Sequence, residues 1–227
     1  MLIPLGLLPG FIWLVFYLNE DLHPEPKGLI ALTFFFGIIS AFAALYGERI
    51  LNAYMNPKIL TLIAPLSIFQ LFYLVGLAAI EETVKFLAAY MSVHKNREFN
   101  EPVDAMIYTT VAALGFATIE NLGALNNSSG GTAMLSGILT TTSIRFVGAT
   151  LLHSLTSGFV GYYWALGIRE FGIKKYLFAG LALATILHTI FNYLIINFGN
   201  LIYIVVFLII IGFFVLNDFE KLKKRAI

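Results

Sequence analysis

Charged side chains stand inside apolar stretches that are long enough to cross a bilayer. Glu81, Glu82 and Lys85 lie in the run 66–93, and Glu120 lies near the end of the next run. A charge in the hydrocarbon of a membrane costs about 2.5–3.5 kcal/mol even on lenient scales. Such residues must pair with one another or line a wet cavity, so a functional site is the first interpretation to consider.

Glu81 and Glu82 have the residue type that general-base catalysis needs. Glu81 and Lys85 are four residues apart, so on a helix they share a face in the order that favours an ion pair. Glu82 points about 100° away. Desolvation and mutual repulsion make one of two adjacent carboxylates a better proton acceptor, which suits activation of water. The structural alternative neutralises one glutamate with Lys85 and the other with Arg145.

Histidines occur in the two following apolar runs. His153 follows Arg145, a supporting charge, and His188 lies four residues before Asn192. That spacing places His188 and Asn192 on one face of a helix. Counted at about 1.5 Å per residue, the polar residues of four helices reach one level of the bilayer. Carboxylates and histidines together can activate water and stabilise the oxyanion formed from a carbonyl. The alternative is that each histidine only satisfies a contact between helices.

Other intramembrane chemistries lack their residues here. The chain has no cysteine, which excludes disulfides, cysteine nucleophiles and thiolate metal sites. The expected spans hold no pair of aspartates and no His-Glu-x-x-His zinc motif. A Gly-x-Ser-Gly serine site is also missing, because Leu155 stands where Ser157-Gly158 would need a preceding glycine.

Composition identifies the bilayer as the solvent of this chain. Of its 227 residues, 59% are hydrophobic and 12% charged, about half the charged share of soluble domains. The net charge of +1 draws in no nucleic acid. We predict an all-α, polytopic transmembrane helix bundle, a single domain over residues 1–227 of a multi-pass cell-membrane protein. At about 20 residues per crossing, the expected spans are 2–18, 29–46, 66–93, 102–123, 133–168, 176–197 and 200–216.

The fifth of these regions, 133–168, is too long for one perpendicular crossing, since at 1.5 Å per residue it would extend roughly 50 Å. We expect a short interfacial helix followed by a span, or one strongly tilted helix, so the count is seven or eight. Lysines and arginines predict the orientation. With the C-terminus in the cytoplasm and the N-terminus outside, ten of twelve flanking positive residues lie inside. A re-entrant segment in the fifth region would invert the N-terminal half.

These residues occur in motifs that resemble the PrsW family of intramembrane endopeptidases, within the wider group of CAAX prenyl endopeptidases and bacteriocin-processing proteases. Each motif alone is weak, but four in this order on successive helices are fairly specific. The motifs are Asp21 to Pro26, Glu81 to Phe86, Asp104 to Tyr108 running into Gly115 to Asn121, and His153 with His188 to Asn192.

The resemblance implies a glutamic-type peptidase that needs no cofactor. Glu81 would activate water, and Glu82 and Lys85 would hold its geometry and charge. His188 and Asn192 would donate hydrogen bonds to the developing oxyanion.

One position departs from the wider group. Prenyl endopeptidases carry a histidine where this chain has Glu120, so the expected partner of Glu81 is His153, oriented by Glu120. The resemblance also implies the substrate, a single-span membrane protein such as an anti-sigma factor. It would be cleaved by a site-1-type cut near the outer face.

Three other functions remain open. A zinc-dependent intramembrane metalloprotease would bind Zn²⁺ through Glu81, Glu120, His153 and His188, since zinc accepts nitrogen and carboxylate ligands. A proton-coupled transporter also buries Glu, His and Arg, although the sequence holds no second copy of the Glu-Glu motif of the kind that transporter repeats produce. A membrane scaffold would keep the fold without catalysis.

Overall fold

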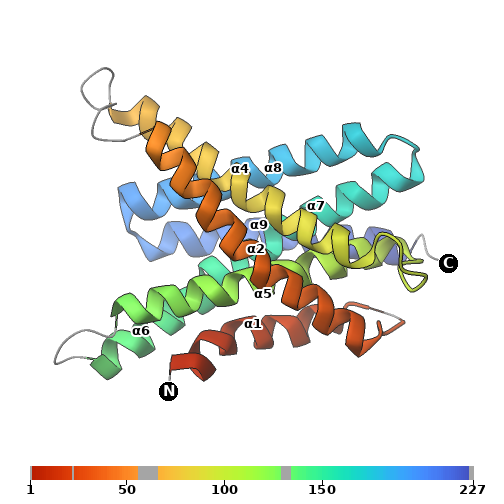
Figure 1. Cartoon of the computed structure of the whole chain (residues 1–227), viewed down its shortest axis with the longest axis horizontal. Helices are drawn as coiled ribbons and strands as arrows, with labels where there is room; N and C mark the ends of the chain where they lie inside the picture. The colour runs from red at the N-terminus through yellow and green to blue at the C-terminus, as the bar shows by residue number, and fades with distance from the viewer. Residues whose placement is uncertain (1, 22, 56–65, 129–133, 225–227) are drawn as a thin grey trace.

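Helices make up nearly all of the structure, a computed structural model that describes residues 2–21, 23–55, 66–128 and 134–224. No strand occurs in these ranges, so the all-α prediction is confirmed for them. Figure 1 shows the helices as one bundle. In chain order they are α1 (Leu2–Leu18), α2 (Lys27–Tyr54), α4 (Leu66–Val93), α5 (Pro102–Ser128), α6 (Met134–Val147), α7 (Ala149–Arg169), α8 (Ile173–Phe198) and α9 (Leu201–Lys223).

The apolar runs predicted most helices, but several boundaries differ. Helix α4 coincides with the predicted run 66–93. Helix α2 continues to Tyr54, well beyond the predicted end at residue 46. The long fifth region divides into α6 and α7 at Gly148, which agrees with the alternative of two segments and not with that of one tilted helix. A side chain at Gly148 would place its Cβ 2.7 Å from the Ile144 carbonyl oxygen, so the break occurs at a residue without one.

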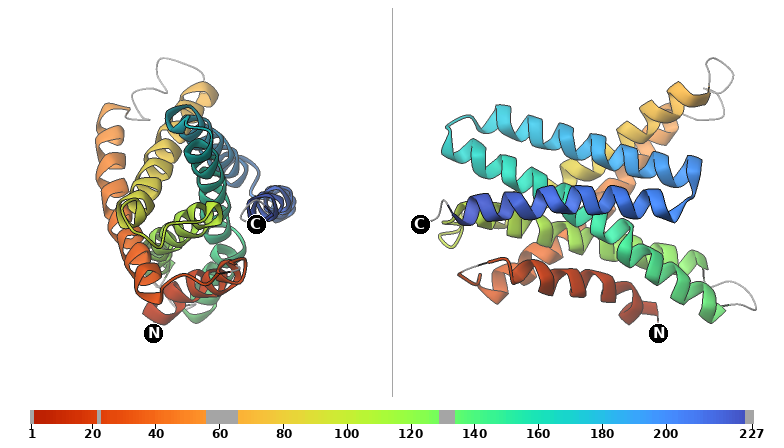
Figure 2. Two further views of the ribbon diagram at one scale, coloured as in Figure 1. Left: turned by 90° about the vertical axis from the view of Figure 1, so that its right-hand side faces the viewer. Right: turned by 180° about the vertical axis from the view of Figure 1, so that it is seen from behind.

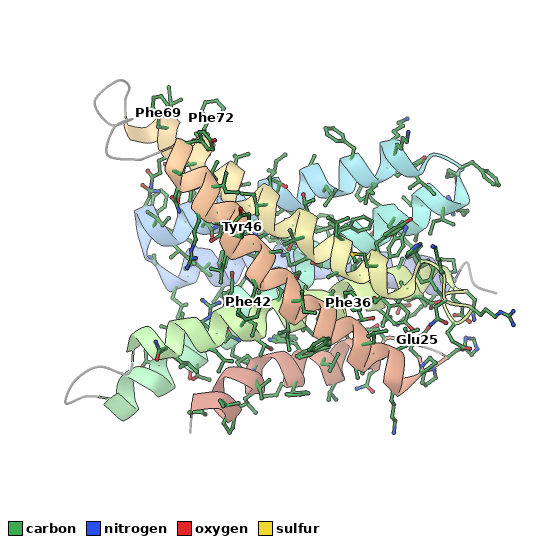
Figure 3. All side chains as sticks on the ribbon, in the orientation of Figure 1. Glu25, Phe36, Phe42, Tyr46, Phe69 and Phe72 are labelled. Atoms are coloured by element: carbon green, nitrogen blue, oxygen red, sulfur yellow. The ribbon has the colours of Figure 1, made fainter. Side chains whose placement is uncertain are left out.

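Four helices in the described part of the chain are long and apolar enough to cross a membrane: α2, α5 up to Asn126, α8 and α9. Helix α1 is a shorter apolar helix, and α4 carries Glu81, Glu82 and Lys85 within its length. The outward side chains fit a lipid surface, since Phe42, Tyr46 and Phe72 are more than half exposed (Figure 3). The number of crossings and the orientation of the termini stay predictions.

Helix α5 runs through the middle of the bundle (Figure 2) and packs against α1, α2, α4, α6, α7 and α9. Within its apolar stretch, 89% is buried, against 39% or less in α2, α8 and α9. Small residues allow this close packing. Gly37 of α2 faces the Ala112 carbonyl, and Gly115 of α5 faces the Phe34 carbonyl, so the two helices touch backbone to backbone. This contact sets the distance between α2 and Glu120 of α5.

Gly115→Ala is expected to destabilise the protein by about 1–3 kcal/mol, the usual cost of overpacking, because the new methyl group would overlap the Phe34 carbonyl. Thermal unfolding in detergent measures the change. Gly123→Ala is the matched control on the same helix, because a Cβ there meets nothing within 4 Å. Equal melting temperatures for the two variants would contradict the close contact between α2 and α5.

Candidate active site

Four helices bring the predicted polar residues together in the interior. Glu81 and Glu82 come from α4, Glu120 from α5, His153 from α7 and His188 from α8. Glu81, Glu82, His153 and His188 are at most 7% exposed. The histidine rings meet edge to face with centroids 5.1 Å apart. The helices therefore meet at one level, as the sequence predicted, and the cluster joins segments that are more than a hundred residues apart.

Glu82 is the structural centre of this cluster. Its Oε1 lies 2.7 Å from Lys85 Nζ and 2.7 Å from His188 Nδ1, and it accepts a hydrogen bond from the Thr156 hydroxyl at 3.1 Å. The side chains of Glu82 and Lys85 are completely buried. This pairing corrects the predicted ion pair between Glu81 and Lys85. On a helix, Lys85 can reach a glutamate either three or four residues before it. The packing of α7 and α8 against Glu82 selects Glu82 as its partner.

Glu82 also sets the tautomer of His188. A carboxylate accepts and does not donate, so the Nδ1 of His188 that faces it carries the proton. In the neutral ring, Nε2 then presents its lone pair, and Nε2 lies 3.7 Å from Glu81 Oε2. The predicted role of His188 as a donor to an oxyanion therefore requires a ring protonated on both nitrogens.

His153 is held in the same way from the other side. Its Nε2 lies 2.8 Å from Glu120 Oε2 and donates to it, so Glu120 orients His153 as the sequence predicted. Its Nδ1 then accepts from the Lys85 ammonium at 3.1 Å. The same Nδ1 lies 4.0 Å from Glu81 Oε2. Both histidines thus turn an unprotonated nitrogen toward Glu81.

Arg145 ties α6 to this assembly. Its Nη2 lies 2.9 Å from Glu120 Oε2, and its Nε donates to the side-chain oxygen of Asn121. Asn121 is buried and donates in turn to the Thr150 hydroxyl at 3.1 Å. The alternative in which Arg145 neutralises one of the α4 glutamates is therefore wrong, because Arg145 is committed to α5.

A cavity of about 760 Å³ opens beside these residues. Glu81, Glu120, His153, His188 and Asn192 all line it, together with side chains of α2 and α6. The buried Glu81 Oε2 has no hydrogen-bond partner in the described part of the chain. A buried carboxylate oxygen without a protein partner can take a water molecule, an ion or a catalytic role. The site thus presents a carboxylate and two histidine nitrogens toward a shared space.

A model of the PrsW family, described as intramembrane metalloproteases, matches residues 25–216. The chain belongs to the PrsW family. It is therefore a multi-pass membrane protein of a family of proteases. It is 30% identical over 200 residues to Protease PrsW of Geobacillus kaustophilus (strain HTA426), which covers 85% of this chain and 79% of the relative.

Two further relatives match over nearly the whole chain. Protease PrsW of Bacillus subtilis (strain 168) is 25% identical over 229 residues, 98% of this chain and 96% of its own length. Protease PrsW of Clostridioides difficile (strain 630) is 29% identical over 225 residues, 98% of this chain and 91% of its own length. No solved structure matches.

The family description implies a metal, and three residues of this PrsW family member fit one. Ligand atoms of Glu81, His153 and His188 all lie within 4.8 Å of one another. Zinc binds nitrogen and oxygen at about 2.0–2.2 Å, so two ligands of one ion lie roughly 3–4 Å apart. The observed 3.7 and 4.0 Å from Glu81 Oε2 to the two rings need little adjustment. Glu82 and Glu120 orient these rings in the way that carboxylates orient metal-bound histidines.

Two observations limit this fit. The sequence placed Glu120 among four possible ligands. In the structure, Glu120 instead accepts a hydrogen bond from His153 Nε2, whereas the ring nitrogen nearer to Glu81 is Nδ1. Lys85 lies 3.1 Å from His153 Nδ1, the nitrogen that would bind the metal. A metal ion there requires the Lys85 ammonium to move away, since two cations would otherwise share one lone pair.

Glu48 of α2 is a cavity residue that the sequence analysis did not single out. The predicted second span ends at residue 46 and therefore leaves Glu48 outside it. Its spacing offered a signal, since Ala41, Ala44 and Glu48 follow at three- and four-residue steps along one helix face. The first two are buried in the bundle, so the third turns toward the same interior.

The motif Asp21 to Pro26 lies away from the cavity, between α1 and α2. Glu25 accepts a hydrogen bond from the Tyr108 hydroxyl of α5 (Glu25 is labelled in Figure 3). His23 lies 2.7 Å from Glu101, just before α5. The motif therefore fastens the α1–α2 connection to the helix that carries Glu120. Burial, aided by repulsion from Asp104, raises the pKa of Glu25 from 4.5 to about 8.

Folding stability is therefore expected to fall as the pH rises through about 8. The folded protein holds a proton on Glu25 that the unfolded chain loses near pH 4.5. The stabilisation is fully present below the unfolded pKa, and it is lost as the pH rises through the folded pKa. Melting temperatures measured between about pH 6 and pH 9 test this. Glu25→Gln, which stays neutral, should flatten the curve, and an unchanged slope in that variant would contradict the assignment.

Proposed function

We propose that this chain is an intramembrane endopeptidase of the glutamic type, in which Glu81 activates the attacking water. The observation that carries the proposal is the unpaired Glu81 Oε2 in the cavity, facing the lone pair of His188 Nε2 at 3.7 Å. A water molecule between these two atoms would donate to both. Its proton would pass to Glu81 as its oxygen attacks the carbonyl carbon, which is general-base catalysis.

The remaining residues would hold this geometry. Glu82 fixes His188, and Lys85 bridges Glu82 and His153. Asn192 lines the cavity on the same face of α8 as His188. Its side-chain amide donates without any change of protonation, so it would hydrogen-bond the oxyanion.

The substrate we propose is a single-span membrane protein that enters the cavity from the bilayer. The walls of the cavity include Phe42, Leu45 and Ile195, which suit a hydrophobic segment. An anti-sigma factor, cut at a site-1-type position near the outer face, is the specific substrate that the family resemblance implies.

A zinc-dependent reaction is the second candidate, favoured by the convergence of Glu81, His153 and His188. When bound, zinc would supply a polarised water and a Lewis acid for the carbonyl. The contact of Lys85 with His153 Nδ1 favours the metal-free proposal.

Cleavage of a purified single-span reporter in proteoliposomes tests the proposed function. Wild type is expected to cleave, and Glu81→Gln to lose about 100-fold or more of the activity while it folds normally. Glu98→Gln, at an exposed glutamate, is the matched control. Wild-type turnover by Glu81→Gln would remove Glu81 from the mechanism, and no cleavage by wild type would favour a transporter or scaffold.

Metal dependence is decided on the same preparation. Activity that survives chelation in protein without bound zinc supports the glutamic mechanism. Activity that is lost with the metal and returns with added Zn²⁺ supports the metalloprotease.

A further inference from the structure

The turn between α7 and α8 carries a phenylalanine whose ring faces outward. Phe171 is 98% exposed, and its φ of 53° is the left-handed backbone conformation. Glycine usually takes this conformation after a helix, because a side chain there crowds the backbone. Gly172 is the next residue, yet the phenylalanine has the left-handed conformation. Neither feature favours folding in water, so the ring points to an apolar environment outside the protein.

Backbone contacts set the shape of this turn. The Gly172 amide donates to the Gly167 carbonyl at 3.1 Å. A Cβ at Gly167 would lie 2.9 Å from the Ile173 Cα, so the ends of α7 and α8 meet backbone to backbone. The position of Phe171 is thus fixed by the turn and not by contacts of its own ring.

A hollow of about 540 Å³ lies beside Phe171. It combines apolar and basic side chains, and its lining residues are Ile168, Phe171, Gly172, Ile173, Lys174 and Lys175. Among the described residues that line it, none is acidic and none also lines the cavity that holds Glu81. A ligand of this hollow therefore meets hydrocarbon and ammonium groups, away from the candidate active site.

The two lysines of the hollow have no acidic partner. Neither forms an ion pair within the part of the chain that the structure describes. The neighbouring Arg169, by contrast, is bound to Glu170. Cations in the first turn of a helix oppose the helix dipole, so the charges of Lys174 and Lys175 do not stabilise α8. Two uncompensated positive charges at one place complement an anion.

The position of the hollow indicates which anion. Helix α8 is long and apolar enough to cross a membrane, and it begins at Ile173. Lys174 and Lys175 therefore lie at the end of an apolar stretch, where lipid headgroups meet hydrocarbon. A phospholipid has its phosphate at this level and its acyl chains directly beside it. The charged and apolar parts of the hollow thus match the two parts of one molecule.

We propose that the α7–α8 turn is a binding site for an anionic phospholipid. The ammonium groups of Lys174 and Lys175 bind the phosphate of the headgroup. Phe171 contacts the glycerol backbone and the first carbons of the acyl chains. A free phosphate would use only the lysines and a neutral lipid chiefly the apolar residues, so the combination selects a lipid with a negative headgroup.

Native mass spectrometry of the full chain in neutral detergent tests the site, with phosphatidylglycerol and phosphatidylcholine as probes. Wild type is expected to bind phosphatidylglycerol more tightly. A lysine near an anionic headgroup contributes about fivefold, so Lys174→Gln combined with Lys175→Gln should weaken phosphatidylglycerol binding about 25-fold. Binding of phosphatidylcholine should hardly change. Lys95→Gln combined with Arg97→Gln is the matched control, because it removes the same charge from exposed positions between α4 and α5, at the same end of the bundle (Figure 1).

Phe171→Gly separates lipid binding from folding. Glycine adopts the left-handed conformation without strain, so the variant should melt at the wild-type temperature or above it. Loss of the apolar contact of the ring should weaken phosphatidylglycerol binding about tenfold or more. A lower melting temperature with unchanged lipid binding would show that the ring serves folding and would overturn its role in the site.

Three further results would overturn the proposal. One is an equal loss of binding in the two double variants, which would reduce the effect to the general charge of the protein. Another is a wild type that binds both lipids equally. The third is displacement of phosphatidylglycerol by glycerol phosphate, which has no acyl chains and would identify a site for free anions.

Discussion

Asn192→Ala is expected to lower kcat about 100- to 1000-fold, the usual effect of losing one oxyanion donor, and to leave KM nearly unchanged. The amide of Asn192 lines the cavity on α8, one turn beyond His188. In the proposed mechanism it bonds the oxygen that becomes negative as water attacks. Its contribution is therefore made in the transition state more than in the bound substrate, which places the loss in kcat.

The comparison needs a control on the same helix. Asn197 of α8 is exposed and bonds only to the Tyr193 carbonyl among the contacts described, so Asn197→Ala should turn over normally. Turnover and thermal stability are measured on the same preparations. A destabilised Asn192→Ala with normal turnover per folded molecule would show that Asn192 serves helix packing and would remove it from the oxyanion site.

His188→Ala is also expected to lose turnover, but for a different reason from the one the sequence indicated. Spacing placed His188 beside Asn192 as a second donor. The structure shows that Glu82 holds the Nδ1 proton, so the neutral ring offers Nε2 as an acceptor toward Glu81. Which nitrogen faces a reactant depends on a partner 106 residues away, and spacing within one helix carries no such information.

The fold was predictable where local rules operate. Apolar run length predicted the end of α4 at Val93, and the excessive length of 133–168 indicated either two segments or one tilted helix, of which the structure has two segments. The rule is wrong at the end of α2, because the apolar run ends at residue 46, before Glu48 and Arg49, whereas the helix continues to Tyr54. A charged side chain inside a helix near a cavity is stabilised by residues that are distant in the sequence. The composition of the helix itself does not reveal these residues.

The sequence predicted which residues form the site better than it predicted which of them bind one another. Intramembrane charge singled out Glu81, Glu82, Glu120 and His153, and the structure brings them together. Lys85 reaches both α4 glutamates by helical spacing, so sequence could not decide which it binds. Burial decides it, because Glu82 is enclosed by α7 and α8 whereas Glu81 faces the cavity.

Lys85→Met should then be among the most destabilising substitutions in the chain. It removes the ammonium that lies 2.7 Å from Glu82 Oε1, and both side chains are completely buried. The remaining contacts of Glu82, from His188 and Thr156, do not supply a fixed positive charge. Breaking a buried ion pair from one side typically costs about 3–5 kcal/mol. The melting temperature in detergent should fall sharply, whereas Lys95→Met, at an exposed lysine just after α4, should leave it unchanged.

A second substitution distinguishes the stability lost with the charge of Lys85 from the stability lost with its side-chain volume. Glu82→Gln removes the charge that Lys85→Met leaves uncompensated, so the double variant should recover most of the lost stability, since replacing both members of a buried pair is often neutral. Activity should not recover, because the Lys85 contact with His153 Nδ1 and the Glu82 carboxylate that orients His188 are both gone. Purely additive stability losses in the double-mutant cycle would show that the two side chains do not interact. Recovery of stability without activity is the result expected if this buried pair exists to hold the two histidines toward Glu81.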